Sequence, residues 1–442
     1  MTPSFAPCRL PAPRLYVLAL AQAFFSIGAC AASDAERIAE LEKKLDRSTQ
    51  MLEQLAARLQ QLEGGAQRGA AIAAAAAPAL QAQVDALEQH VSAISNRPEP
   101  ERGLAMHGFA DVGWAVAGKG HDSGVRTGAL DFYLTPQFGD RVKALIELNV
   151  ETGGDGHVGV DLERVQVGYT LGQTSTLWVG RFHTPYGYWN TAFHHGAQLQ
   201  TAVARPRFLE FEDAGGILPA HSVGIWLNGT RKLSAGRVGY DVYVSNAPTI
   251  QMADPAQAGS GTLDPGLKGA GGRSASIGGN LSLEFKGAAE GLRVGLHALS
   301  AKVFDTATAA AATRLQMLGA WVVYNENDWE LMAEQYSFHN RELTGGLVGS
   351  HGRHRSNAGY VQLGRQFGLF TPYARFERTA LSQVDPYFAQ QEAGQSYKRS
   401  ALGLRYDVNP TTALKFEAMS TQYTDRVVNS FSELRGQLAV RF

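Results

Sequence analysis

The last seven residues of the chain alternate in polarity with the period of a β-strand. One face of such a strand would carry Gly436, Leu438, Val440 and Phe442, and the other Gln437 and Arg441. Apolar–polar alternation that ends in an aromatic residue is typical of the closing strand of an outer-membrane β-barrel. This segment therefore predicts a pore-forming chain rather than a soluble catalyst.

The composition agrees with a barrel better than with a helical membrane protein. Charged residues make up 18% of the 442 residues, and the mean hydropathy is slightly negative. A barrel with a water-filled lumen needs only half of each strand to be apolar, whereas membrane helices are apolar throughout. Residues 101–442 hold equal numbers of basic and acidic residues. Any ion preference must therefore come from where the charges lie.

Residues 1–31 have the pattern of a secretory signal peptide. Arg9 and Arg14 precede an apolar run at 15–27, and small residues follow at 29–31. A transmembrane helix is the weaker alternative, because the run is shorter than the roughly 20 residues that a span requires. Lipidation of Cys30 stays open. Cleavage after residue 31 would remove Cys8 and Cys30, the two cysteines, and so exclude disulfides and thiolate chemistry.

Residues 32–100 are expected to form a periplasmic coiled-coil stalk and linker. The heptad positions are Ile38, Leu41, Leu45, Ser48, Leu52, Leu55, Leu59 and Leu62. A seam spaced 3-4 over four heptads indicates a coiled coil, with a lone amphipathic helix as the alternative. Pro98 and Pro100 close the segment, and a barrel is predicted over 101–442.

Sixteen strands with a period of two follow the stalk. They are expected at 106–116, 126–138, 141–151, 158–171, 175–184, 221–230, 237–246, 274–286, 291–301, 313–324, 328–338, 356–366, 370–379, 397–408, 412–421 and 431–442. Short turns alternate with longer connections, as the periplasmic turns and external loops of outer-membrane barrels do. The sequence therefore predicts an all-β transmembrane barrel of 16 antiparallel strands, with a soluble β-sandwich as the alternative.

The longest connection, residues 185–220, is predicted to fold inward as a pore constriction, since long loops without a fold of their own are usually functional. Its polar candidates, with one residue of the preceding strand, are Arg181, Tyr186, Tyr188, Arg205, Arg207, Glu210, Glu212 and Asp213. A sixteen-stranded pore without such a loop would be wide.

Residues 180–187, Gly-Arg-Phe-His-Thr-Pro-Tyr-Gly, resemble the segment that leads into the constriction loop of the phosphate-selective porin O/P family. The resemblance extends to residues 108–109 and 130–133. It implies a homotrimer of sixteen-stranded porins that admit small anions. Some relatives carry a comparable amino-terminal coiled coil and resemble dicarboxylate channels. The chain departs from the family's dense ladder of arginines and lysines, which leaves phosphate specificity open.

The polar face of the late strands offers a basic wall to a pore. Its members are expected to be Arg375, Arg399, Arg405, Lys415 and Arg435. Opposite an acidic loop this wall would create a transverse field that selects anionic or dipolar solutes. In the alternative, Glu377, Asp407, Glu417 and Glu433 neutralise the wall as cross-strand pairs.

Other functional classes have weaker support. The histidines at 194–195 and 351–354 lack the carboxylates or thiolates that would complete a metal site. No catalytic triad or nucleotide loop is recognisable, so we expect no enzyme, no cofactor and no nucleic-acid partner. The expected surroundings are a lipid bilayer with lipopolysaccharide in the bacterial outer membrane, and the expected cargo is a small hydrophilic solute. The alternative function is envelope tethering through the coiled coil.

Overall fold

A computed structural model describes residues 106–118, 123–152, 158–193, 196–212, 214–252, 261–266, 274–305, 312–344, 352–424 and 429–442. The expected signal peptide (1–31) and coiled-coil stalk (32–100) lie outside these residues and stay predictions. Among the described residues, no helix is both long and apolar enough to cross a membrane.

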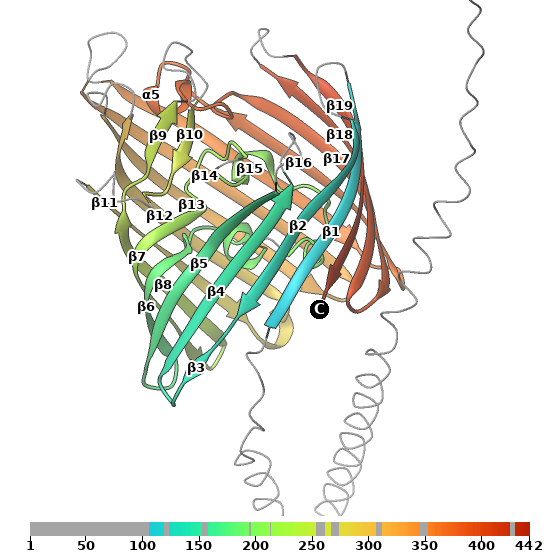
Figure 1. Cartoon of the computed structure of the whole chain (residues 1–442), viewed down its shortest axis with the longest axis horizontal. Coiled ribbons are helices and arrows are strands. Elements are labelled where there is room, and N and C mark those ends of the chain that lie inside the picture. The colour runs from blue at the N-terminus through green and yellow to red at the C-terminus, as the bar shows by residue number, and fades with distance from the viewer. Residues whose placement is uncertain are drawn as a thin grey trace, which may run out of the picture. The chain divides into compact units, whose positions relative to one another are not determined.

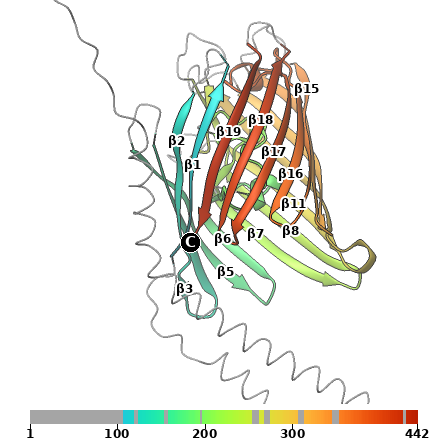
Figure 2. The same cartoon turned by 90° about the vertical axis from the view of Figure 1, so that its right-hand side faces the viewer.

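The described strands form one closed sheet, and its barrel strands pair antiparallel (Figures 1 and 2). The barrel strands are β1 (Met106–Ala117), β2 (Gly124–Leu134), β4 (Val142–Thr152), β5 (Val158–Leu171), β6 (Ser175–His183), β7 (His221–Leu233), β8 (Gly236–Asn246), β11 (Ala275–Phe285), β12 (Leu292–Asp305), β13 (Ala312–Glu326), β14 (Trp329–Thr344), β15 (Arg353–Arg365), β16 (Phe370–Ala380), β17 (Tyr397–Asn409), β18 (Thr412–Tyr423) and β19 (Phe431–Arg441). The predicted sixteen-stranded antiparallel barrel is therefore confirmed.

Three shorter strands do not add to the wall. β3 (Gln137–Phe138) continues β2 along β4. β9 (Thr249–Met252) and β10 (Gly261–Asp264) form a hairpin within the connection between β8 and β11, and β9 also pairs with the end of β12.

The barrel closes where β1 pairs antiparallel with β19. Beyond the last ladder pair, the N–H of Gly108 donates to the carbonyl of Phe442 at 2.9 Å, and the N–H of Phe442 donates back at 3.0 Å. The Phe442 ring also meets Phe132 of β2 edge to face. The aromatic end of the chain thus joins the first two strands at the seam, and the closure leaves no free sheet edge.

Connections alternate in length around the barrel. Residues 327–328 join β13 to β14, and both Asn327 and Asp328 have the positive φ of a tight hairpin turn. This turn lies slightly later than the 325–327 that the sequence indicates, because β13 extends to Glu326. At the other end, the connection between β6 and β7 spans 184–220 and is the longest between barrel strands.

The two faces of the wall follow the two-residue period. On β16, Phe376 and its outward neighbours are exposed, whereas Tyr373, Arg375 and Glu377 are buried. Outward apolar side chains suit lipid, and inward polar ones suit a wet lumen. The inward residues of β16 are buried because another part of the chain covers them, and that part is the long loop.

Candidate functional site

The long connection, residues 184–220, starts and ends at the same point of the wall. The N–H of Thr184 donates to the carbonyl of Ala220 at 2.8 Å, and the Thr184 and Ser222 hydroxyls lie 2.8 Å apart. Asn190 donates its amide to the carbonyls of Thr184 and Ala220. Between these ends the loop lies inside the ring of strands, drawn in light green in Figure 1. We call it the constriction loop.

The first turn of the constriction loop is held by a buried carboxylate on β14. Glu334 accepts hydrogen bonds from the backbone N–H groups of Tyr188 and Trp189, at 2.9 and 2.7 Å. These residues begin the short helix α4 (Trp189–Ala192), whose free N–H groups favour a negative charge. The hydroxyls of Tyr336 and Tyr360 also donate to Glu334. Four donors thus satisfy a carboxylate that is 3% exposed.

The middle of the loop rests on basic side chains of β17 and β18. Lys415 donates to the carbonyls of Ala197 and Ala202, at 2.6 and 2.9 Å. Arg405 donates to the carbonyls of Gln198 and Gln200, at 2.7 and 2.9 Å. These carbonyls have no partners in a helix or sheet, so the cations supply hydrogen bonds that buried backbone requires.

A charged cluster on β16 and β18 holds the next segment. Arg375 donates to the carbonyl of Ala204 at 2.7 Å and pairs with Glu377 at 3.0 Å and Glu417 at 3.8 Å. Glu377 accepts the backbone N–H of Arg207 at 2.8 Å. The side chains of Arg375, Glu377 and Glu417 are all buried. Burying a charge is costly unless the charge is paired and hydrogen-bonded, as these are.

The loop returns to β7 through a second set of contacts. The 3-10 turn at Arg207–Leu209 is anchored where the Phe208 N–H donates to the Tyr397 hydroxyl at 3.0 Å. Glu212 accepts the backbone N–H of His221 at 2.7 Å and also pairs with its ring, whose other nitrogen lies 2.8 Å from Glu163. The acidic end of the loop is therefore tied to β5 and β7.

The predicted constriction residues occupy different environments. Tyr186, Arg205 and Glu212 are buried, whereas Tyr188, Arg207 and Glu210 are half-buried. Arg181 lies on β6 and bonds to the Leu162 carbonyl and the Glu163 carboxylate, and Asp213 lies outside the described residues. The structure places Tyr186 close enough to Arg205 and Glu212 for their charges to interact. Tyr188 lies instead against Arg293 and Trp321, and Arg181 lies against β5.

Burial shifts the pKa of two charged residues of the loop, Arg205 and Glu210. Burial lowers the pKa of Arg205, whose guanidinium donates to the carbonyls of Leu209 and Phe193 and lies 4.0 Å from the Phe211 ring centre. Burial likewise raises the pKa of Glu210, although Arg205 and nearby arginines of the wall act in the opposite direction. Both shifts follow from the cost of keeping a charge away from water.

The basic wall is largely covered. The side chains of Arg375, Arg399 and Lys415 are buried beneath the loop, and only Arg435 is about one-third exposed. The acidic neighbours pair mainly along the same strand, Arg405 with Asp407 and Arg435 with Glu433, at 2.7 and 2.9 Å. The alternative of neutralised charges therefore describes Arg375, Arg405 and Arg435, mostly through same-strand pairs. Lys415 donates instead to loop carbonyls, and Arg399 donates to the Thr421 hydroxyl.

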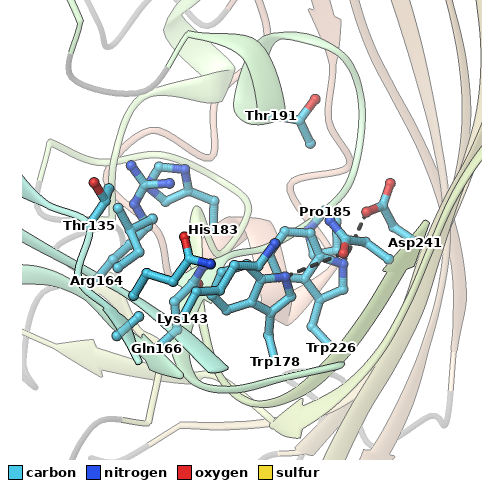
Figure 3. A pocket seen from close by; sticks show the side chains of 14 residues that line it. Thr135, Lys143, Arg164, Gln166, Trp178, His183, Pro185, Thr191, Trp226 and Asp241 are labelled. Atoms are coloured by element: carbon cyan, nitrogen blue, oxygen red, sulfur yellow. Dashed lines mark hydrogen bonds between the residues drawn. The ribbon is translucent and has the colours of Figure 1, made fainter. Parts of the chain in front are cut away.

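A polar cavity of about 640 Å³ lies on the other side of the loop (Figure 3). Its lining comes from the residue that follows β2, from β3–β8 and from the loop: Thr135, Gln137, Lys143, Ala144, Leu145, Arg164, Gln166, Trp178, His183, Pro185, Thr191, Trp226, Asn228 and Asp241. Trp178 and Trp226 stack on neighbouring strands with ring centres 6.1 Å apart. Sequence reasoning missed this site, because its residues are adjacent only through cross-strand register.

The cavity has its own charges. The ammonium of Lys143 lies 5.0 Å from the centre of the Trp178 ring, and Arg164 pairs with Glu147. Asp241 accepts the indole N–H of Trp226 at 3.0 Å. Within the described residues, no group of three or more His, Cys, Asp or Glu side chains is arranged to hold a metal ion. The lining therefore offers a solute charged and aromatic contacts.

Solved outer-membrane channels resemble this barrel. An anion-selective porin from Comamonas acidovorans matches with a TM-score of 0.50 and 14% identity, over 77% of this chain and 99% of the porin. The outer-membrane channel DcaP of Acinetobacter baumannii matches with a TM-score of 0.51 and 9% identity, over 77% of this chain and 97% of that one. The first is described as a porin and the second as a channel.

No family model matches the chain, and the curated proteins hold no significant match. Membership of the phosphate-selective porin O/P family is therefore not confirmed. At these identities the solved structures establish the fold alone. The chain has the fold of the sixteen-stranded outer-membrane porins.

Proposed function

We propose that this chain is an outer-membrane channel for the passive diffusion of small hydrophilic solutes, with a lumen narrowed by the constriction loop. The observation that carries the proposal is the docking of this loop on the inner wall, with a polar cavity beside it. Passive passage needs no covalent chemistry, only a wet path with sites that solutes can leave.

The loop candidates divide into two roles in this proposal. The half-buried Tyr188, Arg207 and Glu210 line the narrowed path. Asp213, which lies outside the described residues, stays a candidate from the sequence alone. The buried side chains, Tyr186 among them, hold the loop in place. Arg181, which pairs with Glu163, supports the start of the loop.

Anions, with phosphate and dicarboxylates as the candidates, are the proposed favoured class. Most of the basic wall is covered by the loop, so Arg435 is the wall residue best placed to act on a solute. On the opposite wall, Lys143 lines the cavity and makes no ion pair with any described residue. A lumenal cation without a counter-charge attracts anions.

The proposed surroundings follow from the barrel and the sequence resemblance. The chain would sit as a homotrimer in an outer membrane with lipopolysaccharide, and its amino-terminal stalk would lie in the periplasm. The tethering alternative depends on residues 32–100, which lie outside the described residues. Deleting residues 32–100 separates the two functions. If the protein is a channel, the deletion leaves its conductance unchanged; if it is a tether, cells with the deletion lose envelope integrity.

Planar-bilayer recording of the purified protein tests the channel proposal. We expect discrete conductance steps, and a reversal potential under a salt gradient that is biased toward anions. Phosphate or succinate should reduce the current. Steps without ion bias would contradict the anion preference alone, whereas a purified, folded barrel that gives no steps would contradict the channel proposal.

A further inference from the structure

Two opposite charges face the cavity beside the constriction loop without forming ion pairs. Lys143 on β4 and Asp241 on β8 are half-buried, and neither pairs with an oppositely charged side chain within the described part of the chain. Isolated charges in a partly enclosed site are costly unless a counter-charge or water meets them. Lys143 and Asp241 therefore mark places where a solute of opposite charge would be attracted more strongly than by the same charges in water.

The tryptophans separate these two charges. Figure 3 shows Arg164 on one side of Trp178 and Trp226 and Asp241 on the other, while the Lys143 ammonium lies over the Trp178 ring. Both indole N–H groups already donate hydrogen bonds. Trp178 donates to Asn228 at 3.3 Å, and Trp226 donates to Asp241 at 3.0 Å. The indoles thus contribute apolar surface between two charged ends rather than further polar contacts.

Strand register limits the distance between the charges. Lys143 is opposite Gly168 of β5, which is opposite Trp178 of β6, and the ammonium reaches over that indole. From β6 to Asp241 on β8 are two strand spacings, or about 10 Å at 4.7–4.9 Å each. An extended peptide advances about 3.3–3.6 Å per residue, so three residues cover the same distance.

We propose that this cavity is a binding site for a short zwitterionic peptide of about three residues, with its carboxylate at Lys143 and its ammonium at Asp241. The inference rests on the proposed channel function and assigns this cavity a second solute class, in addition to the anions proposed for the channel as a whole. A dicarboxylate fits less well, because its second carboxylate would approach Asp241. The cavity volume of about 640 Å³ lies in the range of small-ligand sites.

Block of single-channel current by triglycine at pH 8 tests the inference. We expect triglycine to block, and its N-acetylated, amidated form and succinate to block at least about fivefold more weakly, the value of one exposed charge pair. Lys143→Gln and Asp241→Asn should each weaken triglycine block by a similar factor. Lys143→Arg should retain it, and all variants must show the heat-modifiable gel mobility of a folded barrel.

A charge exchange gives the sharpest test. The double variant Lys143→Glu, Asp241→Lys should regain block, because a zwitterion can enter in the reverse direction. Lys286→Gln and Asp140→Asn, which change exposed residues at the short turns, should leave block unchanged. Equal block by charged and capped peptides, or no effect of the cavity variants, would overturn the inference while the channel proposal stands. A folded protein without conductance would overturn the channel proposal itself.

Discussion

The carboxylate of Glu334 accepts a hydrogen bond from the backbone N–H of Trp189, across 145 positions of sequence, at 2.7 Å. This contact attaches the constriction loop to the inner wall where α4 begins. Within the described residues no cation pairs with Glu334, so N–H and O–H donors stabilise its charge. The loop is thus fixed by polar contacts at specific points of the wall.

Glu334→Gln should loosen the loop. The amide keeps one oxygen, but its NH₂ group faces donors, so hydrogen bonds to a charged acceptor worth roughly 1.5–3 kcal/mol each are lost or weakened. We expect a free energy of unfolding lower by about 2 kcal/mol and larger current fluctuations. Urea unfolding and bilayer recording measure these effects. The matched Glu284→Gln, in an exposed pair with Arg237, should change neither, and equal effects of both substitutions would contradict the account.

Removing one positive charge from the basic wall should have different effects at two positions. Lys415→Met takes the donor from three loop carbonyls and should destabilise the barrel by roughly 1–3 kcal/mol with little change in reversal potential. Arg435→Gln should instead shift the reversal potential toward cations, because this side chain is about one-third exposed. If Lys415→Met shifted the reversal potential as far as Arg435→Gln does, Lys415 could not be covered by the constriction loop.

Glu210 should make selectivity depend on pH. Burial raises its pKa above the ordinary 4.5, so it binds a proton before an exposed glutamate does as the pH falls. Loss of this negative charge should increase anion preference in the window above pH 4.5. The folded state binds the proton more tightly, so the free energy of unfolding should also rise as the pH falls through the raised pKa.

Reversal potentials from pH 8 to 4.5 check this prediction. Glu210→Gln should remove part of the pH-dependent change, whereas Glu284→Gln should keep all of it. An identical pH profile for wild type and Glu210→Gln would show that this residue does not act on the permeating ions.

The barrel seam should tolerate no side chain at residue 108. A Cβ there would lie 2.5 Å from the Asp131 carbonyl oxygen and 2.3 Å from the Phe442 ring. Gly108→Ala should therefore cost about 1–3 kcal/mol of overpacking and slow barrel closure. Refolding into detergent, followed by gel mobility, measures this. Gly364→Ala meets its first atom at 3.5 Å and should refold like the wild type.

The wall was predictable from the sequence because each strand carries its own pattern. Alternation depends only on a strand having one face in lipid and one in the lumen, and the turns carry local signals. Thus the predicted 158–171 coincides with β5, and most other boundaries differ by a few residues. At their loop ends β12 and β14 extend beyond the predicted boundaries, to Asp305 and Thr344, because strand pairing continues there past the apolar band.

The site was less predictable, because it depends on contacts between distant segments. Nothing local to Lys415 indicates that its ammonium would meet Ala197 rather than a solute. A cation on the polar face of a strand can either hold a loop carbonyl or attract a solute, and the sequence looks the same in both cases. Likewise, Trp178 and Trp226 become neighbours only when the register of β6 and β7 is known.

Single-channel conductance before and after shortening the constriction loop tests the central claim most directly. Replacing 196–212 with a short Gly-Ser linker would expose the cations and carboxylates of the wall to lumenal water, which can solvate them. The account predicts a folded barrel with a conductance several-fold higher, roughly in proportion to the wider lumen of an unobstructed sixteen-stranded pore. An unchanged conductance in the shortened, folded protein would contradict it, because the loop would then not limit the path.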